Sequence, residues 1–192
     1  MSEELKPRLI LHSGRVADPL GDLSELTIED LAWALAHTYR WAGMAEPALT
    51  VGQHTIAMAR HYRARQEYGL ALAALMHECG EPFFRDMPFR IKYQPQMQWY
   101  REQEKACGTK ITRKFAPEIE HLLPEIKDAD NAALLTELRQ RFPDTEDRKS
   151  WLTQEHGLRK PTFTLDSKYY ESGDDAYTWL TMYRVLRMEA AS

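Results

Sequence analysis

The stretch Leu70-Ala71-Leu72-Ala73-Ala74-Leu75-Met76-His77-Glu78-Cys79-Gly80-Glu81 decides the expected fold. It opens with an apolar run of Ala, Leu and Met, which are strong helix formers, and this predicts a central helix over 70–81. His77 and Glu81 stand four residues apart and would share a helix face, with Glu78 about 100° round. An imidazole beside carboxylates can ligate a divalent ion and leave one carboxylate free to carry protons. The plain alternative is a helix end with two solvated glutamates and a structural histidine.

Two capping boxes mark helix starts before this stretch. Thr27 is followed three residues later by Asp30, and Thr50 by Gln53. In each pair the two side chains can satisfy free backbone N–H groups at a helix start. Apolar residues recur at helical spacing after each box, so the sequence predicts helices that begin at about residues 28 and 51.

The rest of the chain predicts an all-α protein. Residues 9–16 indicate an extended entry segment, and residues 143–173 indicate a charged, turn-rich connection in which only 162–165 resemble a strand. The length of 192 residues and the 43% hydrophobic content suffice for one well-cored domain. We expect a single helical bundle over residues 1–192 with a core at about 11–142. Further helices are expected at about 95–115, 117–124, 126–141 and 174–190, the last packed on the core.

Composition excludes several classes of protein. The net charge of -4 argues against a binder of nucleic-acid polymers, because a phosphate-backbone footprint normally needs a basic excess. Cys79 and Cys107 are too few for a disulfide scaffold, which favours a reducing cytoplasm, the host's if the chain is phage-encoded. No apolar run reaches the length of a membrane span, and the N-terminus lacks the apolar core of a signal peptide. A homo-oligomer stays an open expectation.

Three residues on three expected helices suggest a metal site. His54 follows a capping box, His77 ends the apolar run, and Asp130 has Ala129 and Ala132 beside it, which let helices approach closely. A metal site between helices needs inward ligands of this kind, one or two from each helix. The remaining histidines lack such a setting and are expected to be structural: His12, His37, His61, His121 and His156.

The order of these residues resembles a known ligand pattern. A lone His, then a His-acid pair, then a distant Asp is the order in the HD-domain metal-dependent phosphohydrolases, here His54, His77-Glu78 and Asp130. The resemblance is strongest to the small all-α 5'-deoxynucleotidases of bacteria and the related phage dATP triphosphohydrolases. It implies an HD-domain helical bundle whose metal ligands are His54, His77, Glu78 and Asp130.

Further motifs of that branch occur in the same order and cover about residues 11–142. Arg40-Trp41 matches an Arg and an aromatic residue before the first His, and residues 77–88 match the block H-D-x-x-E-x(4)-D-x-P. Lys92 matches a later Lys, residues 127–130 match K-x-A-D, and residues 13–30 look like the phage members. The resemblance implies substrate contacts from Arg40, Trp41 and Lys92. It implies catalytic roles for Glu81, as the proton carrier, and for Asp86, as an orienting residue.

The resemblance implies metal-dependent hydrolysis of deoxynucleotides, with Co²⁺, Mn²⁺, Zn²⁺ or Mg²⁺ as the ion. Attack at the α-phosphorus of dATP would release deoxyadenosine and triphosphate, and the phage-like N-terminal part favours this reaction. Hydrolysis of deoxynucleoside monophosphates by a 5'-deoxynucleotidase needs the same ligands and is the first alternative.

Two other functions stay open at this point. Glu78 replaces the family's Asp and is longer by one methylene, about 1.5 Å, so a degenerate nucleotide-binding module without catalysis is an alternative. Residues 77–81 also resemble the H-E-x-x-H helix of zinc metalloproteases with the second His replaced. That interpretation leaves His54, Asp130 and Asp86 unexplained.

Overall fold

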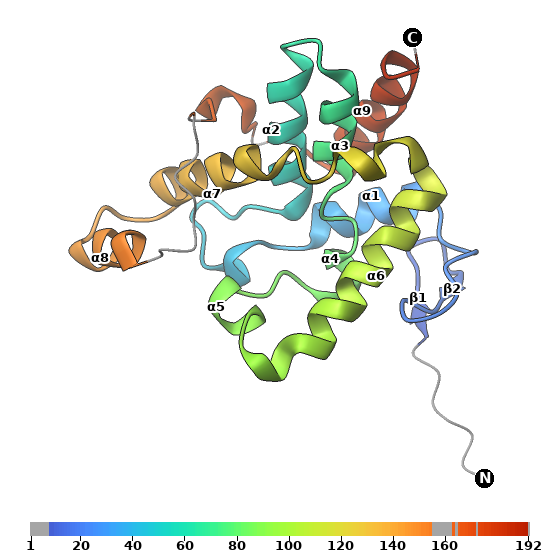
Figure 1. Cartoon of the computed structure of the whole chain (residues 1–192), viewed down its shortest axis with the longest axis horizontal. Helices are drawn as coiled ribbons and strands as arrows, with labels where there is room; N and C mark the ends of the chain where they lie inside the picture. Colours follow the sequence, from blue (N-terminus) through green and yellow to red (C-terminus); the bar gives the residue numbers. More distant parts are fainter. Residues whose placement is uncertain (1–7, 155–162, 164, 172, 192) are drawn as a thin grey trace.

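Two helices form the centre of the described structure, and several other helices pack on them. The computed structural model describes residues 8–154, 163, 165–171 and 173–191. Helix α2 (Val51–Arg63) packs along α3 (Tyr68–Met76), and the two stand side by side in Figure 1. Residues 71–76 of α3 are wholly buried, and three of these six are alanines, whose small side chains allow neighbouring backbones to come close. The described structure is mostly helical, as the sequence predicts.

Both predicted capping boxes are present. Thr27 caps α1 (Ile28–His37) and Thr50 caps α2, and in each case both reciprocal hydrogen bonds are made. The carboxylate of Asp30 does more than complete its box, because it also accepts hydrogen bonds from the backbone N–H and the hydroxyl of Ser13. This fastens the N-terminal segment to the start of α1.

The outer helices cover the central pair. Helix α9 (Ala176–Glu189), which is capped by Asp175, packs on α1 and α3. Its Trp179 is fully buried and donates from Nε1 to the hydroxyl of Thr55 in α2 at 3.2 Å. Helix α7 (Lys127–Arg141) crosses α2, as Figure 1 shows, and α6 (Gln98–Phe115) packs on η3 (Pro117–Leu122). Over the described ranges, no helix combines the length and the apolar character that a membrane span requires.

The structure differs in part from the sequence prediction at residues 9–16 and at residues 143–173. The segment over 9–16 is a small antiparallel hairpin of β1 (Leu9–Ile10) and β2 (Val16–Ala17). The region 143–173, predicted as loop, contains helix α8 (Glu146–Gln154), with acidic residues in its first turn where they favour a helix start. Of the strand expected at 162–165, Thr162 and Thr164 lie outside the described residues, and Phe163 and Leu165 are not in a strand.

The prediction of one continuous helix over 70–81 is wrong. Helix α3 ends at Met76, residues 77–80 form turns, and a new short helix, α4 (Glu81–Phe84), begins at Glu81. Pro82 explains the break, because its ring cannot donate a backbone hydrogen bond and clashes with a preceding helical turn. Gly80 lies so close to α6 that a Cβ there would come within 2.8 Å of the Glu104 carbonyl oxygen. His77 and Glu81 therefore do not share a helix face, and Glu78 lies in a turn.

Candidate metal centre

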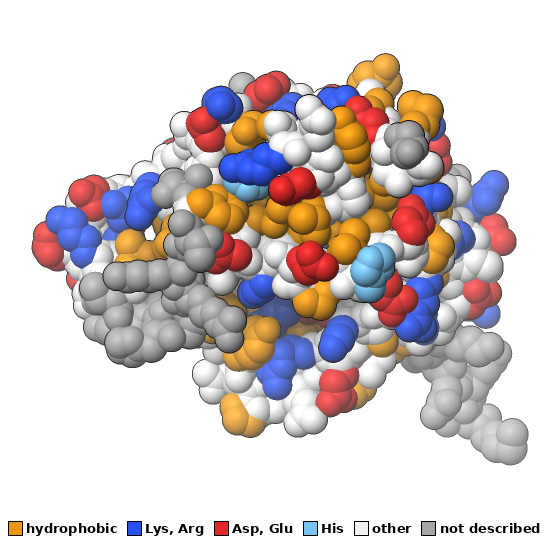
Figure 2. All heavy atoms as spheres, turned by 45° about the horizontal axis from the view of Figure 1, so that its top comes forward, with side chains coloured by type: hydrophobic (Ala, Val, Ile, Leu, Met, Phe, Trp, Pro, Cys, Tyr) orange, Lys and Arg blue, Asp and Glu red, His pale blue; other side chains and the backbone are white. Residues whose placement is uncertain are grey.

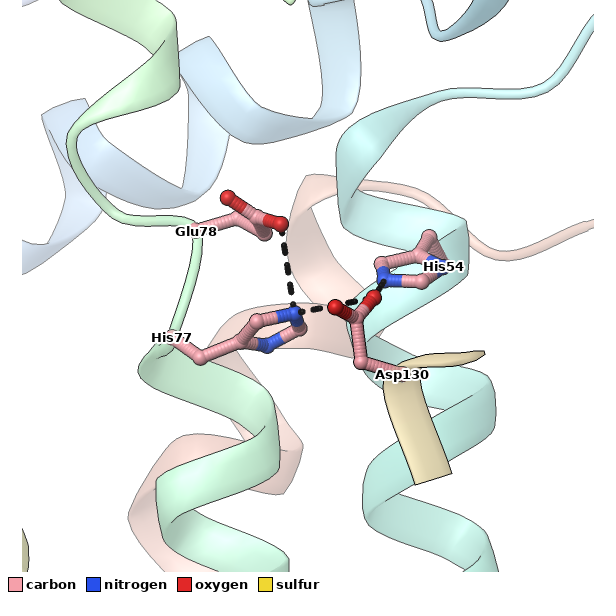
Figure 3. Close-up of side chains that lie close together, drawn as sticks. All are labelled: His54, His77, Glu78 and Asp130. Atoms are coloured by element: carbon pink, nitrogen blue, oxygen red, sulfur yellow. Dashed lines mark ion pairs between the residues drawn. The ribbon is translucent and has the colours of Figure 1, made fainter. Parts of the chain in front are cut away.

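Four side chains from three parts of the chain meet beside the N-terminal turn of α2. His54 comes from the first turn of α2, His77 and Glu78 directly follow α3, and Asp130 comes from the first turn of α7. Figure 3 shows these four side chains converging, with His77 facing both carboxylates. Each offers one ligand atom, and these atoms all lie within 4.8 Å of one another. The structure thus brings together the residues expected as metal ligands in a group that could hold an ion.

Both imidazoles present the same nitrogen to the cluster. His54 Nδ1 donates to Glu137 Oε1 at 2.6 Å, and His77 Nδ1 donates to the Ala74 carbonyl oxygen at 2.8 Å. Each Nε2 is buried and makes no hydrogen bond with any residue that the structure describes. Because buried polar atoms are normally paired, two orphaned nitrogens that face carboxylates indicate that a ligand belongs between them.

The separations within the cluster fit a divalent metal ion. His54 Nε2 lies 3.4 Å from Asp130 Oδ1, and His77 Nε2 lies 3.4 Å from Glu78 Oε1 and 3.9 Å from Asp130 Oδ1. Metal–ligand bonds of about 2.0 to 2.1 Å separate adjacent ligands by roughly 2.9 to 3.4 Å in common coordination geometries. Two nitrogens and two carboxylates are a donor set that suits Zn²⁺, Co²⁺ or Mn²⁺ better than the softer metals. The residues present therefore fit such an ion with only small adjustments.

The charges of the cluster also favour a cation. Burial lowers the pKa of His77, but the carboxylates of Glu78 and Asp130 outweigh this effect and raise it to about 10. Burial raises the pKa of Asp130, but the imidazoles of His54 and His77 and the charge of Lys127 bring it well below its usual range. The carboxylates of the cluster thus favour a positive charge between the four side chains, and a metal ion bound there would displace the proton of His77.

A buried carboxylate beneath the cluster was missed by the sequence analysis. Glu137, on α7 two turns after Asp130, is fully buried. Its oxygens accept from His54 Nδ1, from Arg40 Nε at 3.1 Å, from Trp41 Nε1 at 3.1 Å and from the Tyr170 hydroxyl at 3.1 Å. Burial raises the pKa of Glu137, but the charges of Arg40 and His54 lower it to about 2. The spacing of seven residues from Asp130 was the available signal, since residues two turns apart share a helix face.

Arg40 and Trp41, expected to contact substrate, are therefore held beside the metal cluster. Trp41 has a positive φ of 59°, which is strained for an aromatic residue. Its backbone N–H donates to Asp86 Oδ2 at 2.8 Å, and its indole contacts the edge of Phe142. Asp86 thus fixes the backbone of Trp41. Beside it lies a hollow of about 270 Å³ lined by Thr38, Tyr39, Ala42, Gly43, Arg85 and Asp86.

Glu81, the expected proton carrier, and Lys92, expected to contact substrate, lie together with a third residue, Glu104. Lys92 Nζ lies 2.6 Å from Glu104 Oε1 and 3.6 Å from Glu81 Oε1. Both glutamates are buried, and in each the second oxygen, Oε2, makes no hydrogen bond with the residues that are described. Burial, with the charges of Glu78 and Asp86, raises the pKa of Glu81 well above its usual range. Glu104 gave no sequence signal, because it belongs to a largely polar helix; in the structure it is buried where α6 approaches Gly80.

A larger hollow lies away from this chemistry. It measures about 600 Å³ and lies at the C-terminal end of α2, where Arg60, Arg63 and Lys168 contribute to its lining. These cations already pair with Asp174, Glu189 and Asp166 respectively. We therefore place the candidate site at the His54–Asp130 cluster.

The histidines expected to be structural are distributed over the surface and one aromatic cluster. His12 and His37 stack on Trp33, and His61 is buried against Phe163. His121 is exposed, and His156 lies outside the described residues. A comparison of the chain with protein-family models and with curated protein sequences found no match.

Proposed function

We propose that the chain is a metal-dependent phosphohydrolase of deoxynucleotides, with dATP, cleaved to deoxyadenosine and triphosphate, as the first candidate substrate. The observation that carries this proposal is the pair of buried Nε2 atoms of His54 and His77, which make no hydrogen bond within the described residues and each face a carboxylate oxygen of Asp130 or Glu78 at 3.4 Å. In a histidine with a purely structural role, both buried ring nitrogens would normally be hydrogen-bonded. The resemblance of the motif order to HD-domain enzymes supplies the substrate class.

The four residues of the cluster would hold the ion, with Co²⁺, Mn²⁺, Zn²⁺ and Mg²⁺ as candidates. When bound, a divalent ion supplies positive charge against phosphate oxygens and lowers the pKa of nearby water. Figure 2 shows acidic and basic side chains intermixed on the face that it draws, with a group of Lys and Arg side chains just below its centre. A small anionic substrate suits such a surface better than a polymer does.

Glu81 is the residue proposed to carry the proton. In the reaction the water oxygen forms a bond to the α-phosphorus, the bond from phosphorus to O5' breaks, water loses a proton and O5' gains one. Glu81 is buried next to the cluster, and its Oε2 has no partner in the described residues, so it can accept or donate a proton. Lys92, at 3.6 Å from the other oxygen of Glu81, supplies positive charge at this end of the site.

Arg40 and Trp41 are proposed to bind the nucleotide. Arg40 is buried, and its terminal NH₂ groups form the fork that suits phosphate oxygens. The indole of Trp41, fixed from below by Glu137, is proposed to cover the 2' edge of the sugar and so to disfavour a ribose hydroxyl. The strained backbone of Trp41 supports a functional role, because strain of this kind persists where it is used.

The alternatives differ in how well the geometry supports them. Hydrolysis of deoxynucleoside monophosphates would use the same residues. A degenerate module is less well supported, since the longer side chain of Glu78 still brings an oxygen within 3.4 Å of His77 Nε2. The metalloprotease needs its two ligands on one continuous helix, and α3 ends before His77.

The test is a panel of dNTPs, NTPs and dNMPs with each of the four metal ions, with products resolved by ion-pair chromatography. Equal amounts of deoxyadenosine and triphosphate from dATP are expected, with no turnover after chelation or in Asp130→Ala. Asp128→Asn, which changes the same charge on the same helix, serves as the control. Orthophosphate released from a dNMP would select the deoxynucleotidase, and no turnover of any nucleotide would favour the binding module.

A further inference from the structure

One buried carboxylate joins the metal cluster to the residues proposed to bind substrate. Glu137 accepts four hydrogen bonds from three segments of the chain, because Arg40 and Trp41 are consecutive residues. His54 and the Tyr170 hydroxyl donate to Oε1, whereas Arg40 and Trp41 donate to Oε2. A carboxylate offers about four lone-pair directions, so this group is fully engaged.

The contact with His54 orients a metal ligand. Because Nδ1 of His54 donates to Glu137 at 2.6 Å, the lone pair of this imidazole is left on Nε2, which faces the cluster. A carboxylate in this position also makes the imidazole a stronger ligand, and loss of such a partner typically costs tenfold to a hundredfold in metal affinity. Among the hydrogen bonds of the described residues, this is the one that His54 Nδ1 makes.

The contacts with Arg40 and Trp41 orient the other half of the site. Glu137 engages the Nε–H of Arg40 at 3.1 Å, and the two terminal NH₂ groups of Arg40 are not part of this bond. The same oxygen holds Trp41 Nε1 at 3.1 Å. One carboxylate thus sets the direction of both the guanidinium and the indole.

We propose that Glu137 is a positioning residue that couples the two halves of the site. It sets the ligating nitrogen of His54 through one oxygen and the orientation of Arg40 and Trp41 through the other. The second half of this inference rests on the proposed function, whereas the first half concerns metal affinity alone. A change at Glu137 should therefore disturb metal binding and the environment of Trp41 together, although Glu137 touches neither ion nor substrate.

The test uses Glu137→Gln, which keeps the shape of the side chain. Its amide has only one oxygen, and its NH₂ group must face donors on one side, so the four contacts cannot all survive. Two measurements need no turnover: the Kd for Co²⁺ in a chelator competition, and the indole N–H signal of Trp41 in a ¹⁵N NMR spectrum, assigned with Trp41→Phe. Glu137→Gln is expected to weaken Co²⁺ binding by about tenfold to a hundredfold and to move or broaden the Trp41 signal.

Two further variants keep the result decisive. Thr136→Val removes a buried hydroxyl on the same helix that donates to the carbonyl oxygens of Ala132 and Leu165 and, among the described residues, makes no hydrogen bond to the cluster, so it should leave both readouts unchanged. Glu137→Asp keeps the charge beside Arg40 but is shorter by about 1.5 Å, and it replaces Glu137→Gln if that variant does not fold. A folded variant with unchanged Co²⁺ affinity and an unmoved Trp41 signal would overturn the proposal. If wild type binds Co²⁺ but hydrolyses no nucleotide, the proposed function fails while these two measurements still decide the role of Glu137.

Discussion

Removal of the metal ion should lower the melting temperature of the wild-type protein and leave that of Asp130→Asn nearly unchanged. An ion present at a hundred times its Kd stabilises the native state by about 2.7 kcal/mol. For 192 residues the entropy of unfolding is roughly 0.4 kcal/mol per kelvin. The expected shift on addition of the ion is therefore about 7 °C in wild type.

The choice of Asp130 follows from its place in the cluster. Its Oδ1 lies 3.4 Å from Nε2 of His54 and 3.9 Å from Nε2 of His77, so it reaches both imidazoles. Asn keeps the shape but loses the charge, and the metal-dependent part of the stability should go with it. Differential scanning calorimetry of chelator-stripped protein, with and without Co²⁺, measures the shift, and Asp128→Asn controls for the loss of one charge on α7. An equal shift of about 7 °C in wild type and Asp130→Asn would refute the assignment of the site.

Three further predictions address Glu78, the substrate-binding pair and the pH dependence of stability. Glu78→Asp shortens the side chain and moves a carboxylate oxygen that lies 3.4 Å from His77 Nε2 in the wild type. It should change the metal affinity, measured by chelator competition, or the turnover, measured in a kinetic assay, by about tenfold, or roughly 1.4 kcal/mol. If neither changes, Glu78 is not a ligand. Trp41→Ala should lower the ratio of kcat/KM for dATP to that for ATP by about ten to a hundredfold, because the 2'-hydroxyl of ATP would no longer be buried without a partner. Arg40→Ala should lower both kcat/KM values and leave their ratio unchanged. If Trp41→Ala leaves the ratio unchanged, the indole has a packing role alone. His61 is 4% exposed, and burial together with the charge of Arg65 lowers its pKa from 6.5 to about 4. The unfolded chain therefore binds the proton more tightly than the folded protein does. The free energy of unfolding should fall by up to about 3 kcal/mol as the pH drops from about 6.5 to 4. Urea unfolding of His61→Phe should lack this part of the slope, and the same slope in both proteins would contradict the assignment to His61.

The sequence predicted the features that depend on neighbouring residues. Both capping boxes, at Thr27 and Thr50, are local, because each involves two residues three apart, and both are present. The cap of α9 is equally local, because Asp175 accepts a hydrogen bond from the backbone N–H of Thr178, three residues later. The apolar periodicity predicts an α3 that is too long, because the break associated with Pro82 ends the helix at Met76.

Contacts between distant segments were not predictable from one sequence. The bond from Arg40 to Glu137 joins residues 97 apart, and no periodicity links the two ends. Tyr170 reaches Glu137 from a region that the sequence marks only as a connection. Glu104 is buried because the backbones of α6 and Gly80 come close, which is a property of the folded chain. Such residues become visible only when the helices are placed in three dimensions.

The spacing of two residues on α7 has a consequence for how this protein can vary. Asp130 belongs to the candidate metal site, and Glu137, seven residues later on the same helix, bonds to His54 of that site. An inserted or deleted residue between them would turn Glu137 by about 100° and move it by about 1.5 Å along the axis, away from His54 and Arg40. The half-buried Leu134 and Leu135 can be exchanged for other residues, but the length of this segment cannot change. Differences in length should instead accumulate just after α7, at the exposed residues 143–145, where an extra residue alters no contact of the cluster.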